Sequence, residues 1–248
     1  MTSLRYSHVP ALSSGDKLST IRLWFYGVSS AHLAATAVVT LTIDMTQDDD
    51  PKVRIYWYVR WLLLTCWINL VMLFYLPVSF YCEWKQRYSK YTQYVQALDR
   101  LRDIAMTGII FPCTLCCDIW FWCLWNTDRK LIATERIFDY LPEWAQHSLH
   151  TVSALVIVLD LVLVPRRRPP SLKPGLVALF AFTTLYSIAI ILSSSLTEYH
   201  AYEFFARSNI IQIIFILLFG TLQILIVYYL QWFFIDFVWS SRLNKVKN

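Results

Sequence analysis

Residues 152–164 read VSALVIVLDLVLV, an apolar run that only Ser153 and Asp160 interrupt. An α-helix needs about 20 predominantly apolar residues to cross a hydrocarbon core of about 30 Å, and this run belongs to such a window at about 147–165. Five further windows lie at about 21–43, 56–80, 104–126, 174–196 and 208–237. The sequence therefore predicts an all-α integral membrane protein, a bundle of six transmembrane helices.

The overall composition agrees with a membrane protein. Hydrophobic residues make up 57% of the 248 positions and charged residues only 16%, against about 25% charged residues in soluble domains. The first long apolar run follows a polar leader of some twenty residues and is too long for a signal peptide, so we expect it to be a membrane span. We interpret the chain as a six-span domain at 20–240 between cytosolic tails at 1–19 and 241–248.

The basic residues alternate between the two sides of the predicted bundle. Of the 22 Lys and Arg residues, fifteen lie in the N-terminal segment, between spans two and three, in RRRPPSLK (166–173) and in the C-terminal tail. The other loops hold seven, and one of them carries the acidic run 48–50. By the positive-inside rule both termini lie in the cytosol. These clusters suit anionic lipid head groups, so the expected partner is the membrane; we expect no nucleic acid, and protein partners are unknown.

The cysteines and the longest loop are expected to have structural roles. A C-x-x-C-C pattern at 113–117 lies inside span three without a second Cys or His pair at suitable spacing, which favours thiols packed between helices over a zinc site. The sequence predicts no metal and no cofactor. The segment 82–103 is expected to form an amphipathic helix on the cytosolic surface, and Pro112 is expected to kink span three.

Polar side chains at membrane depth are costly and are therefore candidates for function. They are Arg60, Thr65 and Asn69 in span two, Asp118 in span three, His147 and His150 at the start of span four, and Asp160 further along it. At 1.5 Å per residue, Thr65, Asp118 and His150 lie about 14, 12 and 5 Å below the outer boundary. All three are expected in the outer half of the membrane, with Thr65 and His150 offset by about 9 Å.

Each of these residues also has a structural interpretation. The hydroxyl of Thr65 could bond back to its own helix, and an interfacial His is often an amphipathic anchor. His147 and His150, three residues apart, would share a helix face and could bind a metal. Asp160 could pair with a neighbouring helix, and Asp118 with Arg60. A hydroxyl nucleophile needs a base such as imidazole, and Thr65 with His150 could supply that pair, although the pattern alone does not select it.

Four stretches resemble a known family. LRDIAMTGIIFP (101–112), FWCLWNTDRKLI (121–132), YLPEWAQHSLHT (140–151) and RRPPSLKPGL (167–176) are similar to the androgen-induced and androgen-dependent TFPI-regulating proteins. The resemblance is strongest over about 98–176. It implies a six-span membrane protein in a family that includes threonine hydrolases of fatty acid esters of hydroxy fatty acids. The expected location is the endoplasmic reticulum or the plasma membrane, and the sequence does not decide between them.

The resemblance also implies residue roles. His150 matches the family's catalytic histidine, the second of an H-x-x-H pair, and Thr65 in VRWLLLTCWIN matches the nucleophile. Asp160 occupies the acidic position ten residues beyond the histidine, and Tyr202 and Trp239 match an outer-loop tyrosine and a closing tryptophan. Asn69 and His147 are candidate oxyanion donors on geometry alone. Asp118 is a candidate for orienting His150, a role for which the resemblance supplies no residue.

Three departures from the family pattern leave substrate preference open. Ala133-Thr134 replaces Tyr-Pro, Gln231-Trp232 replaces Gly-Glu, and Asn69 lies one position late. Two other classes compete with the hydrolase. A transporter or regulatory scaffold would use the polar residues as a pathway, although no inverted repeat is evident. A metal-dependent lipid enzyme would need histidine clusters that five histidines hardly provide.

Overall fold

The computed structural model describes residues 17–88, 92–197 and 199–245, with side chains described up to residue 240. Six helical segments in this part of the chain are long and apolar enough to cross a membrane: Lys17–Thr42, Leu64–Arg87, Gln93–Leu131, Glu143–Leu163, Lys173–Leu196 and Ile210–Ser240. The all-α fold with six candidate spans is therefore confirmed. Most of the predicted N-terminal tail lies outside the described residues.

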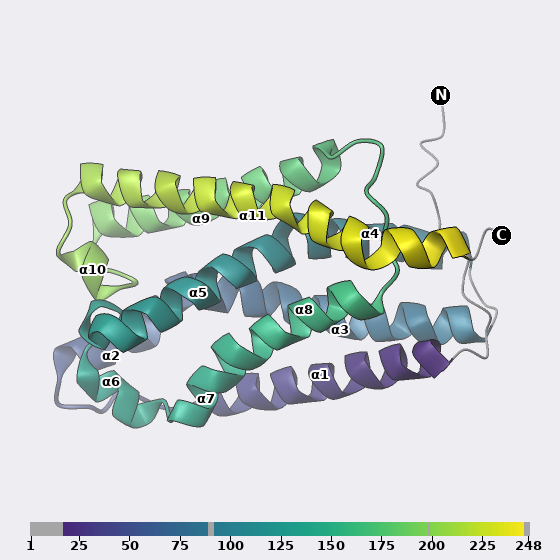
Figure 1. Ribbon diagram of the computed structural model, residues 1–248. Helices are drawn as coiled ribbons and strands as arrows, with labels where there is room; N and C mark the ends of the chain where they lie inside the picture. The colour runs from purple at the N-terminus through teal and green to yellow at the C-terminus, as the bar shows by residue number, and fades with distance from the viewer. Residues whose placement is uncertain (1–16, 89–91, 198, 246–248) are drawn as a thin grey trace.

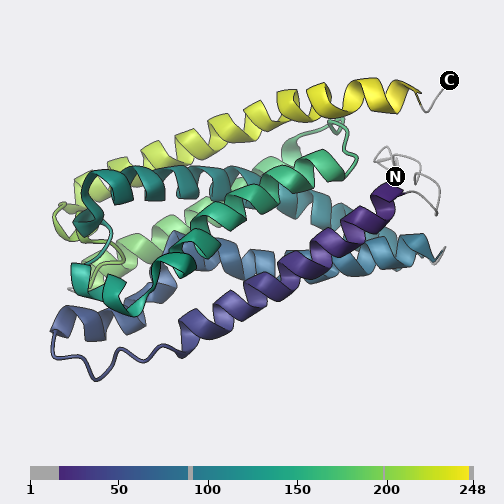
Figure 2. The same ribbon diagram turned by 60° about the horizontal axis from the view of Figure 1, so that its bottom comes forward.

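The long helices run side by side along one direction (Figures 1 and 2). They are α1 (Lys17–Thr42), α3 (Leu64–Arg87), α4 (Gln93–Ala105) with α5 (Phe111–Asp128), α7 (Glu143–His147) with α8 (Ser153–Leu163), α9 (Lys173–Leu196) and α11 (Ile210–Lys245). The beginning of α1 and the end of α11 lie at the same end of the bundle (Figure 1). Short helices α2 (Pro51–Val59), α6 (Glu135–Tyr140) and α10 (Glu203–Ala206) gather at the opposite end. We call this opposite end the capped end.

The second span begins later than the window 56–80 predicted. Helix α2 passes into a 3-10 turn, Arg60–Leu62, and Leu63 is extended with φ −68° and ψ 134° before α3 starts. The indole of Trp67 donates to the carbonyl oxygen of Trp61 at 2.9 Å, across this break. The apolar residues of 56–63 therefore lie at the capped end and do not form one continuous helix with α3.

Within the predicted surface segment 82–103, residues 82–87 belong to α3 and residues 93–103 to α4, and α4 is continuous with the third span instead of forming a separate surface helix. Helix α3 continues to Arg87, and α4 runs through a π-helical turn, Met106–Ile110, directly into α5. Arg102 of α4 is buried and pairs with Glu83 of α3 at 3.3 Å and with Asp99 at 2.7 Å. This buried pairing holds α4 against α3 and makes it the first part of the third span.

Pro112 is the second residue of α5, which begins directly after the π-helical turn. Proline lacks the N–H that would bond back along the helix, and π-helical turns are one of the recognised causes of helix bending. A neighbouring helix supplies a further donor here, because Gln231 Nε2 of α11 bonds to the carbonyl oxygen of Thr107 at 2.7 Å. A π-helical turn supported by α11 therefore precedes Pro112, at the place where the sequence predicts a kink.

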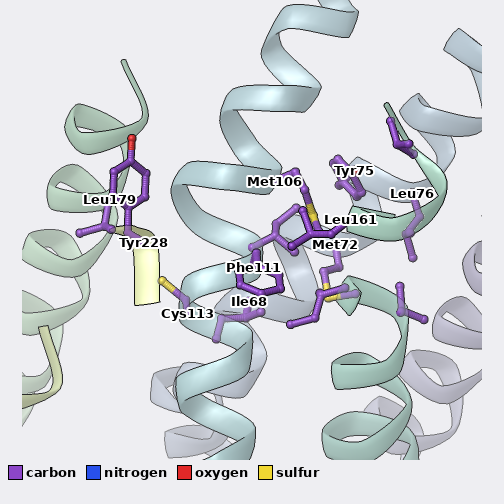
Figure 3. Packing of buried hydrophobic residues seen from close by; sticks show 14 of the residues in the cluster. Ile68, Met72, Tyr75, Leu76, Met106, Phe111, Cys113, Leu161, Leu179 and Tyr228 are labelled. Carbon is purple, nitrogen blue, oxygen red and sulfur yellow. The ribbon is translucent and has the colours of Figure 1, made fainter. Parts of the chain in front are cut away.

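The main core joins the middle of the spans (Figure 3). Ile68 and Met72 of α3, Met106 and Phe111 of the third span and Leu161 of α8 are buried in one cluster. In contrast, many apolar side chains of α11 are exposed, among them Phe237 at 82%. Exposure of this kind is costly in water and natural in lipid, and it agrees with the membrane assignment.

A close approach of two backbones in this core involves two glycines. A Cβ added to Gly108 would lie 2.8 Å from the carbonyl oxygen of Gly175 in α9. Gly108→Ala should therefore lower the free energy of unfolding by about 1–3 kcal/mol, the usual cost of overpacking. Gly220→Ala is the matched control, because nothing lies within 4 Å of its added Cβ. Thermal unfolding in detergent measures both, and an unchanged Gly108→Ala midpoint would contradict the close contact.

Asp48 ties the loop between α1 and α2 to α6. Its carboxylate accepts from the Tyr140 hydroxyl at 2.7 Å and from Arg136 Nε at 3.0 Å. The Tyr140 hydrogen bond lowers the pKa of Asp48 below its ordinary value. The folded carboxylate therefore binds protons less readily than the unfolded one, so its stabilising contribution is complete above the unfolded pKa of about 3.9 and is lost as pH falls through the folded pKa.

Asp48→Asn should reduce thermal stability at pH 7 and flatten the loss of stability below about pH 4, because the titrating carboxylate is gone. The measurement is the unfolding midpoint in detergent from pH 3 to pH 7. Asp49→Asn serves as control, since the Asp49 side chain is 99% exposed and lies 4.0 Å from Arg136. Equal effects from both substitutions would argue against the Asp48 contact.

Candidate functional site

Thr65 lies in the first turn of α3, immediately after the break at Leu63. Its Oγ1 lies 3.5 Å from Cys117 Sγ of α5. Thr65 lines two cavities at once: a larger cavity of about 310 Å³ between α3, α5, α9 and α11, and a smaller cavity of about 140 Å³ bordered by α1, α3 and the start of the fourth span. Its hydroxyl-bearing side chain therefore belongs to the wall that both cavities share.

His150 also lines the smaller cavity, and several contacts hold its ring. It lies in a second π-helical turn, Ser148–Val152, and is only 4% exposed. Its ring stacks on Phe121 with centroids 3.5 Å apart and an angle of 5°. Nδ1 lies 3.0 Å from Asp118 Oδ1. A carboxylate only accepts hydrogen bonds, so this contact places the proton on Nδ1 and leaves Nε2 with a free lone pair.

Asp118 is fixed by two side chains from the fourth span. Besides His150, the hydroxyl of Ser153 donates to Asp118 Oδ2 at 2.7 Å. The suggested ion pair between Asp118 and Arg60 is wrong, because Arg60 instead donates to the carbonyl oxygens of Thr40 and Leu41. Asp118 therefore has the geometry of a group that orients His150.

Thr65 and His150 line the same small cavity but are not joined by a hydrogen bond in this structure, where the Thr65 hydroxyl contacts Cys117. Cys117 Sγ, a carboxylate oxygen of Asp118 and a ring nitrogen of His150 all lie within 4.8 Å of one another. Catalytic hydrogen bonds are often long before substrate binds. The structure thus brings the nucleophile and base candidates to one site, with Cys117 next to both.

The same three groups are also the described set that could hold a metal ion. The sequence did not indicate it, since Cys117 and Asp118 are consecutive residues on one helix and His150 comes from another. A tetrahedral zinc ion would need a further ligand or water beside them. Their arrangement makes removal of metal a necessary control for any activity.

His147 does not take part in this site. It is exposed, its Nδ1 lies 3.0 Å from Thr151 Oγ1, and its ring packs against Trp122 at 4.8 Å. The expectation that His147 and His150 share a helix face is wrong, because the π-helical turn adds a residue per turn and breaks the usual i, i+3 relation. His147 is therefore not a candidate oxyanion donor.

Asn69 and Tyr202 both line the smaller cavity. Asn69 Nδ2 donates to the carbonyl oxygen of Thr65 at 2.9 Å, while its buried Oδ1 has no partner among the described residues. Tyr202 Oη accepts from the backbone N–H of Leu64 at 3.0 Å. Burial raises the pKa of Tyr202 well above its ordinary value, which keeps the hydroxyl protonated. The two residues fix the start of α3, where Thr65 lies.

Asp160 lies outside this site, contrary to its place among the supporting candidates. It is completely buried, accepts from the hydroxyls of Tyr26 at 2.7 Å and Tyr75 at 2.6 Å, and pairs with Arg166 at 2.6 Å. Ten residues along a helix separate it from His150 by about 15 Å. Trp239 is likewise structural, because its indole donates to the carbonyl oxygen of Leu161 at 2.8 Å. Asp160 links α1, α3 and α8 away from both cavities.

Three curated proteins are similar to parts of this chain. Androgen-dependent TFPI-regulating protein of Mesocricetus auratus is 31% identical over 120 residues, 48% of this chain and 52% of the relative. The protein of that name in Rattus norvegicus is 30% identical over 120 residues, with the same coverage. Androgen-induced gene 1 protein of Homo sapiens is 26% identical over 110 residues, 44% of this chain and 46% of the relative. The matches thus span about half the length of these relatives.

No solved structure matches this chain. The model of the family described as FAR-17a/AIG1-like protein matches residues 23–234, a range that includes all six candidate spans in whole or large part and every residue of the site. The resemblance inferred from residues 101–176 is therefore confirmed over most of the molecule. The chain belongs to the FAR-17a/AIG1-like protein family.

Proposed function

We propose that this chain is a multi-pass membrane hydrolase that cleaves fatty acid esters of hydroxy fatty acids, with Thr65 as nucleophile and His150 as base. One observation carries the proposal: a threonine and a histidine from different spans line one apolar cavity, and a buried carboxylate holds the histidine by Nδ1. A nucleophile, a base and an orienting acid are the three parts that hydroxyl-based acyl transfer requires. The resemblance of residues 101–176 to a family that includes such hydrolases supports the same class.

The reaction would proceed in two steps. His150 Nε2 accepts the Thr65 proton as Oγ1 attacks the ester carbonyl carbon, and the tetrahedral intermediate collapses by breaking the bond to the alcohol oxygen. The imidazolium returns the proton to that oxygen, which releases the hydroxy fatty acid and leaves an acyl-threonine. His150 then takes a proton from water, the hydroxide attacks the acyl carbon, and the proton returns to Thr65 as the fatty acid leaves.

The start of α3 offers donors for the negative charge on the carbonyl oxygen. The first N–H groups of a helix lack partners inside the helix and carry partial positive charge. Thr65 is the second residue of α3, and Tyr202 Oη holds the N–H of Leu64 beside it. The N–H groups of Cys66 and Trp67 also donate, to the carbonyl oxygen of Leu63 at 3.0 and 3.3 Å, which leaves the N–H of Thr65 itself as the candidate oxyanion donor of this turn. We prefer it to Asn69, whose Nδ2 already bonds to the Thr65 carbonyl oxygen.

The competing nucleophile is Cys117, and the cavity walls favour Thr65 over it. Cys117 lines only the larger cavity, and His150 lines only the smaller one, whereas Thr65 lines both. Thr65 is therefore the residue that a substrate can reach from the larger cavity while it remains next to the cavity of the base. An ester joins two chains at one carbonyl, and two apolar cavities that meet at Thr65 suit that shape.

The site lies toward the capped end of the bundle. Thr65 lies in the first turn of α3 and His150 directly before α8, and both helices begin toward that end (Figure 1). With both termini in the cytosol, as the charge pattern predicts, this end faces the lumen of the endoplasmic reticulum or the cell exterior. Ester substrates would enter from the bilayer and water from that side. Protease protection of a tag at either terminus tests this orientation.

The test is hydrolysis of a palmitic acid ester of 9-hydroxystearic acid by the purified protein in nanodiscs, with release of both products measured by mass spectrometry. A fluorophosphonate probe should label the protein covalently, and the labelled peptide should contain Thr65. Treatment with a chelator should leave the rate unchanged. Loss of activity with the chelator would favour a metal enzyme built on Cys117, Asp118 and His150. If a well-folded sample shows neither hydrolysis nor labelling, the result would favour a transporter or a regulatory scaffold.

A further inference from the structure

Arg60 is a buried cation beside the candidate catalytic residues. It is 7% exposed and lines the smaller cavity together with Thr65 and His150. No acidic side chain is among the residues that line this cavity. Within the described residues no carboxylate lies within 4.0 Å of its guanidinium nitrogens, although ten such contacts involve other basic side chains.

The contacts of Arg60 satisfy the guanidinium only in part. Its two terminal nitrogens donate to the carbonyl oxygens of Thr40 and Leu41 at 3.3 Å each, and the group stacks on Trp57 at 3.6 Å from the ring centroid. Nε is buried and has no hydrogen-bond partner in the part of the chain that the structure describes. Those carbonyls end α1 and carry partial negative charge, so the arginine also closes that helix. A full positive charge in an apolar cavity nevertheless lacks a full counter-charge, which is costly unless a ligand supplies it.

We propose that Arg60 binds the ionised carboxylate of the ester substrate, and that this carboxylate belongs to the alcohol part of the ester. The inference rests on the hydrolase function proposed above and names the group that the smaller cavity recognises. Guanidinium groups pair with carboxylates through their fixed set of donors, and the free Nε gives Arg60 a donor that no protein group uses.

The position of His150 decides which part of the ester lies next to Arg60. The imidazolium must return its proton to the alcohol oxygen as the ester bond breaks, so the leaving alcohol lies in the cavity that His150 lines. Arg60 lines that same smaller cavity. No charged side chain is among the residues that line the larger cavity, which suits an acyl chain. The substrate therefore places its acyl chain between α5, α9 and α11 and its hydroxy acid near Arg60.

The test compares three substrates with the same palmitoyl group in wild-type nanodiscs: its ester with 9-hydroxystearic acid, the methyl ester of that compound, and palmitoyl glycerol phosphate. Loss of the charged partner should lower kcat/KM about 10- to 100-fold for the methyl ester. In Arg60→Gln the free acid should lose its advantage, so that kcat/KM becomes the same for the free acid and the methyl ester. Arg60→Lys should restore part of the preference for the free acid.

Arg54→Gln is the matched control. Arg54 also donates to backbone carbonyl oxygens, those of Asp48 at 2.6 Å and Asp49 at 3.1 Å, but it does not line either cavity. It should keep the wild-type ratio of the two rates. An equal loss on both substrates in Arg60→Gln would overturn the proposal and leave Arg60 as a structural group at the end of α1. Arg60-dependent cleavage of the phosphate compound alone would overturn the carboxylate assignment.

Binding of the product separates this proposal from the hydrolase function. Free 9-hydroxystearate should raise the thermal unfolding midpoint of the wild type more than its methyl ester does, and Arg60→Gln should lose this difference. If the wild type hydrolyses nothing but shows this Arg60-dependent binding, the hydrolase function fails and the carboxylate site stands. If it hydrolyses both esters equally and binds both products equally, the carboxylate site fails and the hydrolase function stands.

Discussion

Thr65→Ala is expected to lower ester hydrolysis by about 10³-fold or more and to abolish fluorophosphonate labelling. Loss of a nucleophile removes the covalent pathway, and only binding and oxyanion stabilisation remain. Folding should be retained, because Thr65 is half-buried and its hydroxyl has one weak contact, 3.5 Å from Cys117 Sγ. The measurement is the initial rate with the free-acid ester, at matched protein amounts and with the unfolding midpoint recorded for each variant.

Two threonine variants and one cysteine variant sharpen this result. Thr65→Ser keeps a hydroxyl and should retain measurable activity and labelling. Thr183→Ala removes another threonine from the larger cavity, but that hydroxyl donates to the carbonyl oxygen of Leu179 at 3.0 Å and should be dispensable. Cys117→Ala should stay active. If labelling survives in Thr65→Ala and disappears in Cys117→Ala, the nucleophile is the thiol and the assignment of Thr65 is wrong.

Hydropathy predicts the fold well because a segment that crosses lipid must satisfy all its backbone hydrogen bonds internally, and a helix does so. The six windows match the six candidate spans of the described chain within a few residues at most ends. The failures occur where backbone geometry departs from a regular helix. The break at Leu63 and the π-helical turn before Phe111 leave no mark on average hydropathy, since such averages read composition and not hydrogen-bond pattern.

The site was predictable only in part for the same reason. The resemblance gave Thr65 and His150 by position, and polarity within a span gave Asp118 as a candidate. Helical spacing wrongly placed His147 beside His150, since the spacing rule holds for a regular helix and not for the π-helical turn Ser148–Val152. The contact of Cys117 with Thr65 joins residues 52 positions apart, and no periodicity in a single sequence encodes such a tertiary contact.

Asp118→Asn is expected to lower kcat by about 10²- to 10⁴-fold with little change in KM. An amide in place of the carboxylate can donate to Nδ1 of His150, which moves the imidazole proton to Nε2 and removes the lone pair that would accept the Thr65 proton. Asn can still accept from the Ser153 hydroxyl, which now lies 2.7 Å from Oδ2, so the fold should be kept. Steady-state kinetics and the unfolding midpoint measure the two effects separately.

Asp160→Asn is the matched variant, because both aspartates are buried in the bundle and only Asp118 contacts His150. Asp160→Asn removes the charge that lies 2.6 Å from Arg166 but leaves Asp103 as an ionic partner at 3.3 Å, so it should lower the free energy of unfolding by about 1.5–3 kcal/mol, the usual worth of a hydrogen bond to a charged group. Any protein that remains folded should keep its kcat. Asp118→Asn with full activity would show that the hydrogen bond to His150 serves packing alone. Loss of kcat in folded Asp160→Asn would show that the distant charge network reaches the site.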